Sequence, residues 1–199
     1  MVVANYLMKL ICFGLNFFNV ILHKCQRWAI GMGINKANTL NFIKYVLEET
    51  TANIVIDADA IRNLSDIDFL GRAILTPNER EFIRLTGIKE VSQDLAKEFA
   101  LNHNCVVVLK EHNSFITDGK QDYINCTGNA RLAKGGSGDI LSGIICGLVA
   151  IGVSLFDASS LGSYILGRAA ELVTVNEYSA MPKDIIYKIP AVIEELLNI

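Results

Sequence analysis

Two short apolar runs constrain the fold of this chain more strongly than any other feature of its sequence. Residues 53–57 (NIVID) and 105–110 (CVVVLK) each consist largely of β-branched or other apolar residues and end in a charged residue. A strand that is buried on both faces gives such a continuous apolar run, and these strands occur in parallel sheets that helices cover on both sides. The runs therefore predict an α/β protein with a mainly parallel central sheet.

Segments with helical spacing separate these two strands from further short strands. Additional strands are expected at 27–31, 73–76, 114–117 and 123–125, the last two flanking a turn at Asp118-Gly119. Helices are expected at 36–49, 79–85, 95–101, 139–151, 155–176 and 184–198. Gly87 is expected to end the second of these helices as its C-cap. Strands that alternate with helices, followed by a helical last third and uninterrupted by a linker, predict one layered α/β domain.

The composition excludes several classes of protein. Apolar residues make up 51% of the 199 residues and charged residues 20%, which argues against a disordered chain. The net charge of −3 contains no block of like charges, so a nucleic-acid partner is not expected. The five cysteines never form a CxxC pair and the three histidines show no ligand spacing, which favours a reducing, cytoplasmic location and argues against a metal site built from side chains alone.

The first residues of the chain form an apolar segment of unusual composition. Residues 2–22 are mostly apolar, but Asn5, Lys9, Asn16 and Asn19 interrupt them. A membrane-spanning helix requires about 20 consecutive apolar residues. We therefore favour a strand or helix buried at the edge of the core over membrane attachment.

A glycine-rich segment at 135–139 (GGSGD) precedes a long apolar helix. Glycines allow backbone N–H groups to approach a ligand, and a helix N-terminus adds partial positive charge. Together these features predict an anion hole for a phosphoryl group. Asp139 would be a weak base there, which phosphoryl transfer tolerates; the alternative role for Asp139 is to cap the helix.

Five motifs in order resemble one protein family: 55–60 (VIDADA), 75–81 (LTPNERE), 107–110 (VVLK), 127–129 (TGN) and 135–139 (GGSGD). They are similar to motifs of the ADP-dependent NAD(P)H-hydrate dehydratases, a family of the ribokinase-like superfamily whose members are often the C-terminal half of a bifunctional repair protein. The resemblance runs from about Trp28 to Asn198. It implies a ribokinase-like three-layer αβα sandwich over residues 28–199, preceded by an atypical segment, 1–27, in which the usual N-terminal part is shortened or altered.

The resemblance also implies a reaction and its partners. Hydrated NADH or NADPH (NADHX and NADPHX) would be phosphorylated on the ring hydroxyl by ADP, or by ATP, and phosphate would then leave to restore the ring. Mg²⁺ would bridge the phosphates. Members of the family tend to form homo-oligomers, so a homo-oligomer is expected here.

The same resemblance assigns residues by position. Asp139 would accept the hydroxyl proton, and the amides of Gly135, Gly136, Ser137 and Gly138 would hold the transferred phosphoryl group. Residues expected to bind the AMP part or line the nucleotide side are Lys110, Glu111, His112, Asn113, Ser114, Asn125, Thr127, Gly128, Asn129 and Gly138. Residues expected to face the hydrated nicotinamide nucleotide are Gly33, Asp57, Asp59, Asn78 and Asp139.

The sequence alone leaves alternative roles open for three of these residues: Asp57, Asp59 and Lys110. Asp57 and Asp59 end a buried strand, which is the edge where open α/β sheets bind ligands, but turn and cap roles would also account for them. For Lys110 the alternative to a binding role is a solvated strand end. An active dehydratase is therefore the first hypothesis, another ribokinase-like small-molecule kinase the second, and an inactive nucleotide-binding module the third.

Departures from the family pattern motivate the third hypothesis. Asn78-Glu79-Arg80-Glu81 replaces the family's usual His-Pro-Gly-Glu, and Glu111 replaces a glycine. Asparagine can donate a hydrogen bond but cannot carry the charge of an imidazole. Glu111 would place a carboxylate near an anionic nucleotide. Met32 replaces the proline of the family's Gly-Pro-Gly turn.

Overall fold

The computed structural model describes residues 27–31, 39–62 and 64–198. The expectations for residues 1–26, Met32 and Gly33 therefore lie outside the described residues. Within the described ranges, no helix is both long enough and apolar enough to cross a membrane.

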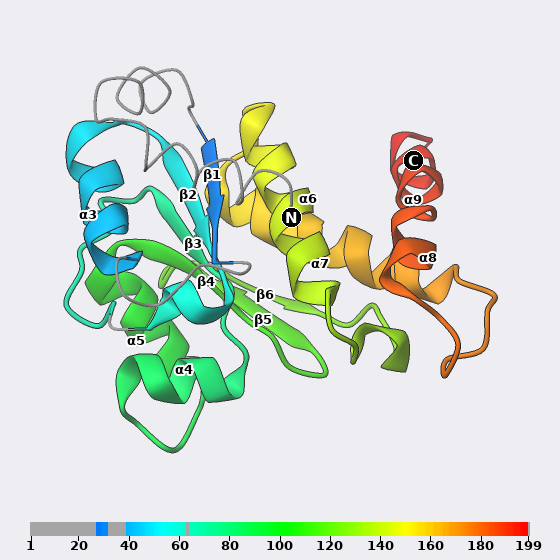
Figure 1. Ribbon diagram of the computed structural model, residues 1–199, viewed down its shortest axis with the longest axis horizontal. Helices are drawn as coiled ribbons and strands as arrows, with labels where there is room; N and C mark the ends of the chain where they lie inside the picture. The colour runs from blue at the N-terminus through cyan, green and yellow to red at the C-terminus, as the bar shows by residue number, and fades with distance from the viewer. Residues whose placement is uncertain (1–26, 32–38, 63, 199) are drawn as a thin grey trace, which may run out of the picture.

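A six-stranded sheet in which the strands follow their order in the chain forms the centre of the molecule (Figure 1). The strands are β1 (Arg27–Ile30), β2 (Asn53–Ile56), β3 (Ala73–Leu75), β4 (Cys105–Leu109), β5 (Ser114–Thr117) and β6 (Asp122–Asn125). The pairs from β1 to β4 are parallel, and β5 and β6 continue the sheet as an antiparallel hairpin. The predicted mainly parallel sheet and its terminal hairpin are confirmed.

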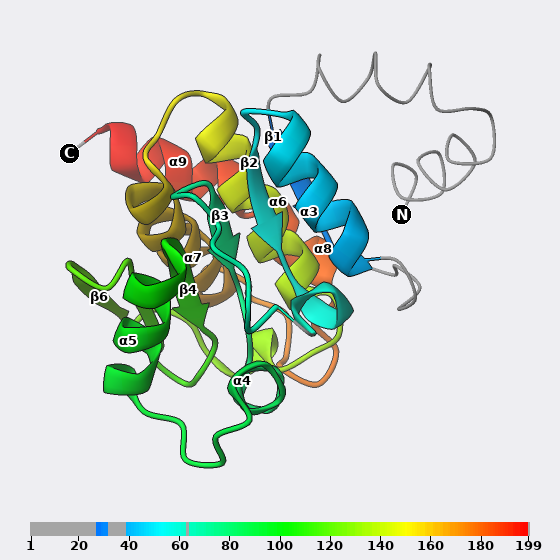
Figure 2. The same ribbon diagram turned by 90° about the vertical axis from the view of Figure 1, so that its left-hand side faces the viewer.

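The sequential strand order determines where the helices lie. Right-handed crossovers that always step in one direction place their helices on the same face of the sheet. The helices α3 (Thr39–Glu49), α4 (Glu79–Thr86) and α5 (Gln93–His103) form that layer, which faces the viewer in Figure 2. The opposite face is covered by α6 (Ser137–Ala150), which packs on β1 and β2, and by α7 (Leu155–Glu171), which packs on β4, β5 and β6.

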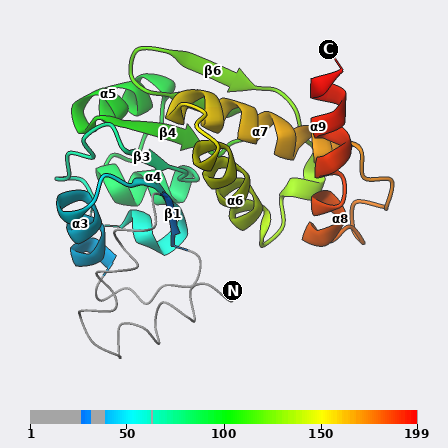
Figure 3. The same ribbon diagram turned by 90° about the horizontal axis from the view of Figure 1, so that it is seen from above.

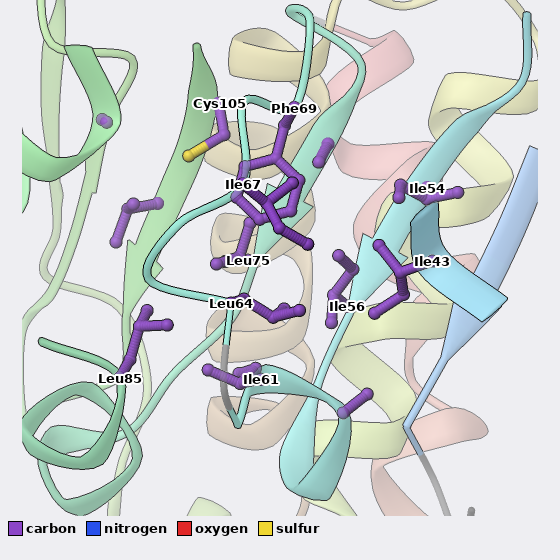
Figure 4. Close-up of a cluster of buried hydrophobic side chains, with 14 of the residues drawn as sticks. Ile43, Ile54, Ile56, Ile61, Leu64, Ile67, Phe69, Leu75, Leu85 and Cys105 are labelled. Carbon is purple, nitrogen blue, oxygen red and sulfur yellow. The ribbon is translucent and has the colours of Figure 1, made fainter. Parts of the chain in front are cut away.

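Side chains of β2, β3, β4 and β5 alternate between two hydrophobic cores. Ile54, Ile56 and Leu75 point into the core under α3, α4 and α5, which Figure 4 shows together with Phe69. Val55, which lies between two of these residues, belongs to the second core, under α6 and α7. Both faces of the strands are therefore buried, which explains their continuous apolar sequences.

The C-terminal helices differ from the sequence expectation in two places. The helix expected at 155–176 ends at Glu171, before the β-branched run 173–175, whose side chains lose rotamer freedom in a helix. The helix expected at 184–198 is two helices, α8 (Pro182–Ile186) and α9 (Ile189–Leu197). Pro190 causes the break, because it has no N–H to donate and its ring would clash with the carbonyl of Ile186. Both helices lie beside α7, far from α3 (Figures 1 and 3).

The remaining elements agree with expectation to within a few residues. Gly87 ends α4 in the left-handed region at φ +73°, and its N–H donates to the carbonyl of Ile83. A short 3₁₀ helix, η1 (Ala58–Ile61), follows β2, and a second, η2 (Ala130–Leu132), follows β6. Both 3₁₀ helices lie where the strands leave the sheet, next to the candidate site.

Candidate active site

Four residues that directly follow the parallel strands lie at one edge of the sheet. These residues are Gly31 after β1, Asp57 after β2, Thr76 after β3 and Lys110 after β4. Ligands of open α/β sheets bind at this carboxyl edge. The N-terminus of α6 reaches the same edge, because an ideal Cβ at Gly138 would lie 3.1 Å from Asp57 Oδ2 and 3.4 Å from Lys110 Nζ.

Asp57 is a buried carboxylate with two side-chain partners. Only 2% of its surface is exposed. Its Oδ1 accepts a hydrogen bond of 2.8 Å from Thr76 Oγ1 and one of 2.6 Å from Lys110 Nζ. A buried charge is tolerated only when it is paired in this way.

Lys110 connects Asp57 to the first turn of α4. Its Nζ lies 3.9 Å from Glu81 Oε2, so the ammonium lies between two carboxylates. Its backbone N–H donates to the carbonyl of Pro77 at 2.8 Å, and Lys110 forms a parallel bridge with Asn78. These contacts hold Lys110 in a partly buried position, unlike the solvated strand end that was the alternative.

Asn78 begins α4 through a capping box. Its Oδ1 accepts from Glu81 N–H at 2.9 Å, and its own N–H donates to Glu81 Oε2 at 2.9 Å. The acceptor end of the amide is therefore engaged with the helix. No hydrogen bond within the described residues engages Nδ2, and Asn78 lines the cavity described below.

The glycine-rich segment forms the start of α6. Gly136, with φ +98°, is its N-cap. Because glycine has no side chain, no side chain of the N-cap residue occupies the first N–H groups of the helix. Ser137 is buried, and its hydroxyl has no hydrogen-bond partner in the described part of the chain. Asp139 occupies the third helical position and is exposed; no hydrogen bond or ion pair reaches its carboxylate from the described residues. Asp139 is therefore not the cap of this helix.

A cavity of about 680 Å³ opens beside the edge of the sheet and the start of α6. Its walls include most of the residues expected on the nucleotide side: Lys110, Glu111, His112, Ser114, Asn125, Thr127, Gly128, Asn129 and Gly138. Asn78 and Ser137 also line it, whereas Asn113, Gly135, Gly136, Asp57, Asp59 and Asp139 do not. A volume of this size is typical of a small-molecule site.

Segment 125–129 is bound to α7, and its side chains form one wall of the cavity. Asn125 is buried, and its Nδ2 donates to the carbonyl of Ser163 at 3.2 Å. Thr127 Oγ1 lies 2.9 Å from Asn125 Oδ1, and the N–H of Gly128 donates to Glu171 Oε1 at 2.8 Å. Asn129 Nδ2 donates to the carbonyl of Ala170 at 3.2 Å. These side chains fix the shape of the wall by contacts within the protein.

The sequence interpretation did not assign several residues of this site, among them Thr76, Glu81 and Lys134. Thr76 and Glu81 lie inside the motif 75–81 and bind Asp57 and Asn78 respectively. Lys134 lines the cavity, and its Nζ donates to the carbonyls of Tyr178 and Ala180 at 3.1 and 2.7 Å. The motif 75–81 could have identified Thr76 and Glu81. Lys134 could not be found in this way, because its contacts join residues more than 40 positions apart.

One of the expected substrate residues, Asp59, does not join this group. Asp59 is exposed on η1, and its Oδ1 lies 3.3 Å from Nε of Arg62, so it does not join Asp57 in the buried pair. Gly33 lies outside the described residues. Within the described ranges, no group of three or more His, Cys, Asp or Glu side chains forms a metal-binding cluster.

The sheet topology and the cavity at its carboxyl edge define an α/β protein with the ribokinase-like fold. A ribokinase-like superfamily protein from Enterococcus faecalis has the same fold, with a TM-score of 0.76 at 22% identity over 90% of this chain and 66% of its own. The family model of NAD(P)H-hydrate dehydratase matches residues 1–191. The chain belongs to this family.

Relatives agree with this assignment. The ADP-dependent (S)-NAD(P)H-hydrate dehydratase of Neisseria meningitidis serogroup B is 34% identical over 161 residues, which are 73% of this chain and 54% of that protein. The ADP/ATP-dependent NAD(P)H-hydrate dehydratase of Bacillus subtilis, co-crystallised with ATP and Mg²⁺, gives a TM-score of 0.77 at 28% identity, covering 85% of this chain and 64% of its own.

The extent of these matches bears on the domain prediction. The chain spans from 29% to 57% of the length of the curated relatives it matches. The match to the family model begins at residue 1 of this chain. It therefore includes the apolar N-terminal segment, which contains none of the five motifs. The boundary between residues 27 and 28 stays a prediction.

Proposed function

We propose that the chain catalyses the ADP-dependent dehydration of hydrated NADH or NADPH. The β-phosphoryl group of ADP would move to the ring hydroxyl, giving AMP and a phosphorylated hydrate, and the C–O bond would then break to release phosphate. In the net reaction, hydrate and ADP yield NAD(P)H, AMP and phosphate. Membership of the family supports this reaction.

One structural observation carries the proposal. The start of α6 meets the carboxyl edge of the sheet beside Lys110, and Asp139 in its first turn has a carboxylate without a partner in the described residues. Backbone N–H groups at a helix N-terminus stabilise a phosphoryl group, and phosphoryl transfer depends mainly on positioning and charge stabilisation. A carboxylate free of internal bonds is available to accept the hydroxyl proton.

The remaining roles follow from position relative to this point. The amides of residues 135–138 would hold the transferred phosphoryl group, and the wall formed by 110–114 and 125–129 would hold the rest of the nucleotide. Gly33 and Asn78, with Asp57 and Asp59 at the end of β2, are proposed to face the hydrated nicotinamide nucleotide. For Asn78 the free Nδ2 donor supports this role.

We include Mg²⁺ and a choice of ADP or ATP in the proposal. Mg²⁺ usually binds through one or two carboxylates, water and substrate phosphates, and not in a cage of protein ligands. The phosphates and water would supply most of the ligands of the ion, and Asp139, in the first turn of α6, would be a carboxylate close to the transferred phosphoryl group. When bound, Mg²⁺ would neutralise charge that develops on the phosphates.

We also propose a cytoplasmic homo-oligomer. The scattered cysteines support a reducing compartment. Large apolar side chains are exposed toward the C-terminus, including Tyr178 at 94%, Tyr187 at 75% and Leu197 at 81%. Exposed apolar surface favours association. Light scattering coupled to size-exclusion chromatography tests the assembly, and a monomer at micromolar concentration would contradict it.

The proposed reaction is tested by following recovery of nicotinamide absorbance from hydrated NADH with Mg²⁺ and ADP, with release of AMP measured in parallel. Asp139→Asn should lower turnover by at least about 10²-fold, the usual effect of losing a positioned base. ADP affinity measured by calorimetry should stay within about twofold of the wild-type value, because Asp139 does not line the cavity.

Asp157→Asn is the matched control for this variant. Asp157 occupies the third position of α7, as Asp139 does in α6, and bonds only Ser154 at that helix start. Its turnover should equal that of the wild type. Unchanged turnover in Asp139→Asn would contradict the role of that residue, and ADP binding without any turnover by the wild type would favour an inactive nucleotide-binding module.

A further inference from the structure

The position and contacts of Lys110 differ from those of a lysine in an ordinary surface ion pair. Its ammonium belongs to the cavity wall, touches the start of α6 and is held by a buried carboxylate that does not line the cavity. We propose that Lys110 Nζ binds the terminal phosphate of ADP, and that Asp57, itself held by Thr76, is a positioning residue that directs Nζ to that phosphate. The inference rests on the proposed function only for the identity of the nucleotide.

The distance to Gly138 places the ammonium at the phosphate end of the nucleotide. An ideal Cβ at Gly138 would be 3.4 Å from Nζ, so the ammonium lies against the backbone of the first turn of α6. The positive end of that helix and the Lys110 charge therefore converge on one point of the cavity. Two positive groups that converge on a cavity attract the most anionic part of a ligand, and in a nucleoside diphosphate this is the terminal phosphate.

The hydrogen bonds of Lys110 leave capacity for a ligand. An ammonium has three N–H donors. Within the described residues Nζ makes one hydrogen bond, to Asp57 Oδ1, and Glu81 Oε2 at 3.9 Å is beyond hydrogen-bond distance. The side chain is 23% exposed, so a ligand in the cavity can reach the remaining donors.

Asp57 is suited to fixing the ammonium in place. Its side chain is 2% exposed, and Thr76 Oγ1 and Lys110 Nζ both bind the same oxygen, Oδ1. The hydroxyl donor holds the carboxylate in one orientation, and the carboxylate in turn holds the ammonium at one position through its hydrogen bond. Oδ2 would lie 3.1 Å from a Cβ at position 138, so glycine there lets the helix start approach the pair.

The test compares ADP with AMP, which lacks the terminal phosphate, by calorimetry at constant ionic strength. Lys110→Met should weaken ADP binding about 10- to 100-fold, the range expected for a lost hydrogen bond to a charged group, and change AMP binding less than about threefold. Lys110→Arg should recover part of the ADP affinity. The matched control is Lys120→Met, which removes an exposed lysine of the β5–β6 turn and should change neither affinity.

A double variant tests the positioning role separately. In Asp57→Asn the ammonium loses the carboxylate that directs it, so ADP affinity should fall about 10-fold while AMP affinity changes less than about threefold. Adding Asp57→Asn to Lys110→Met should lower ADP affinity no further, because Asp57 acts through Nζ.

Thr76→Val tests the same role with a milder change, since it removes only the donor that orients Asp57. It should reduce ADP affinity about threefold, and Thr76→Ser should restore it. This pair provides the readout if Asp57→Asn does not fold, which circular dichroism would show.

The outcomes separate this inference from the proposed function. Equal weakening of ADP and AMP by Lys110→Met, or no ADP binding by the wild type, overturns the phosphate contact. A further loss of ADP affinity when Asp57→Asn is added to Lys110→Met, or wild-type affinity in folded Asp57→Asn or in Thr76→Val, overturns the positioning role. If the wild type fails to repair hydrated NADH but the ADP-specific effect of Lys110 is present, the inference holds and the proposed reaction fails.

Discussion

Asp57 organises two close approaches of backbone at the scale of single residues. Its carboxylate faces Gly138, and its carbonyl oxygen lies against Gly31 at the end of β1. An ideal Cβ at Gly31 would be 1.7 Å from this oxygen, and Gly31 has φ +132°, a conformation that side chains rarely adopt. Glycine is therefore required at position 31 for two independent reasons.

Gly31→Ala should lower the free energy of unfolding by about 3 kcal/mol, because it adds backbone strain and a steric overlap that requires β1 to shift. Urea denaturation followed by circular dichroism measures the change. Gly143→Ala is the matched control: Gly143 is exposed on α6 with open space around it, so alanine there should stabilise the protein by about 0.5–1 kcal/mol. Equal stability of the two variants would contradict the close packing of Gly31 on Asp57.

At the scale of elements, Asn78 connects the start of α4 to the cavity. Its Oδ1 caps α4, and the residue lines the cavity with its Nδ2 donor unused within the described residues. The family's usual histidine is absent at this position, so we propose that a neutral amide serves both as cap and as substrate contact. The cap and the proposed substrate contact therefore use opposite ends of one side chain.

Different substitutions of Asn78 should separate these two roles. Asn78→Ala should lower the free energy of unfolding by about 1 kcal/mol through loss of the N-cap. Asn78→Asp keeps a capping oxygen and should retain stability within about 0.5 kcal/mol, but it lacks the Nδ2 donor and should raise KM for the hydrate. Thermal unfolding and steady-state kinetics measure both effects. An unchanged KM in Asn78→Asp would contradict the substrate contact.

Local sequence predicted the elements well, because each has a strong local cause. The run 105–110 is a strand buried on both faces, and Gly87 ends α4 as expected. The errors at α7 and α8–α9 concern helix ends, where the β-branched residues 173–175 and Pro190 overrode an apolar pattern that continued. Pro190 was visible in the sequence and could have located the break.

The candidate site was less predictable, because its contacts join residues far apart in the chain. Motif spacing identified Asp57 and Lys110 separately, but their hydrogen bond spans 53 residues. Nothing local shows that Asp57 is nearly inaccessible, because its burial depends on how β2, β3 and β4 align. The pairing of Asp59 with Arg62 is local, by contrast, since the two residues lie three positions apart.

At the scale of the whole molecule, the cavity lies between segments that belong to both halves of the chain. Residues from 78 to 166 line it, and they come from the start of α4, the segment after β4, the β5–β6 hairpin, the segment around η2, α6 and α7. A ligand in this position binds the folded state and not the unfolded chain. Nucleotide binding should therefore stabilise the entire domain.

ADP at 100 times its calorimetric Kd should stabilise the protein by about 2.7 kcal/mol and raise Tm by about 5–10 °C for a chain of this size. Differential scanning calorimetry measures the shift. Inorganic phosphate at the same concentration should give a much smaller shift, because it lacks the contacts of the AMP part. Equal shifts with ADP and phosphate would show that the cavity does not bind the nucleoside.

The sequential strand order has a consequence for synthesis of the protein on the ribosome. All six strands and the helices of one layer precede residue 137, so a nascent chain can assemble the sheet and its first core in the order in which residues emerge. Val55, Val106 and Ile116 on the other face have no cover until α6 and α7 are made. A chain stalled before Ser137 would expose this apolar sheet face, and exposed sheets of this kind associate readily. During synthesis, α6 and α7 therefore cover this apolar face only after the whole sheet has been made.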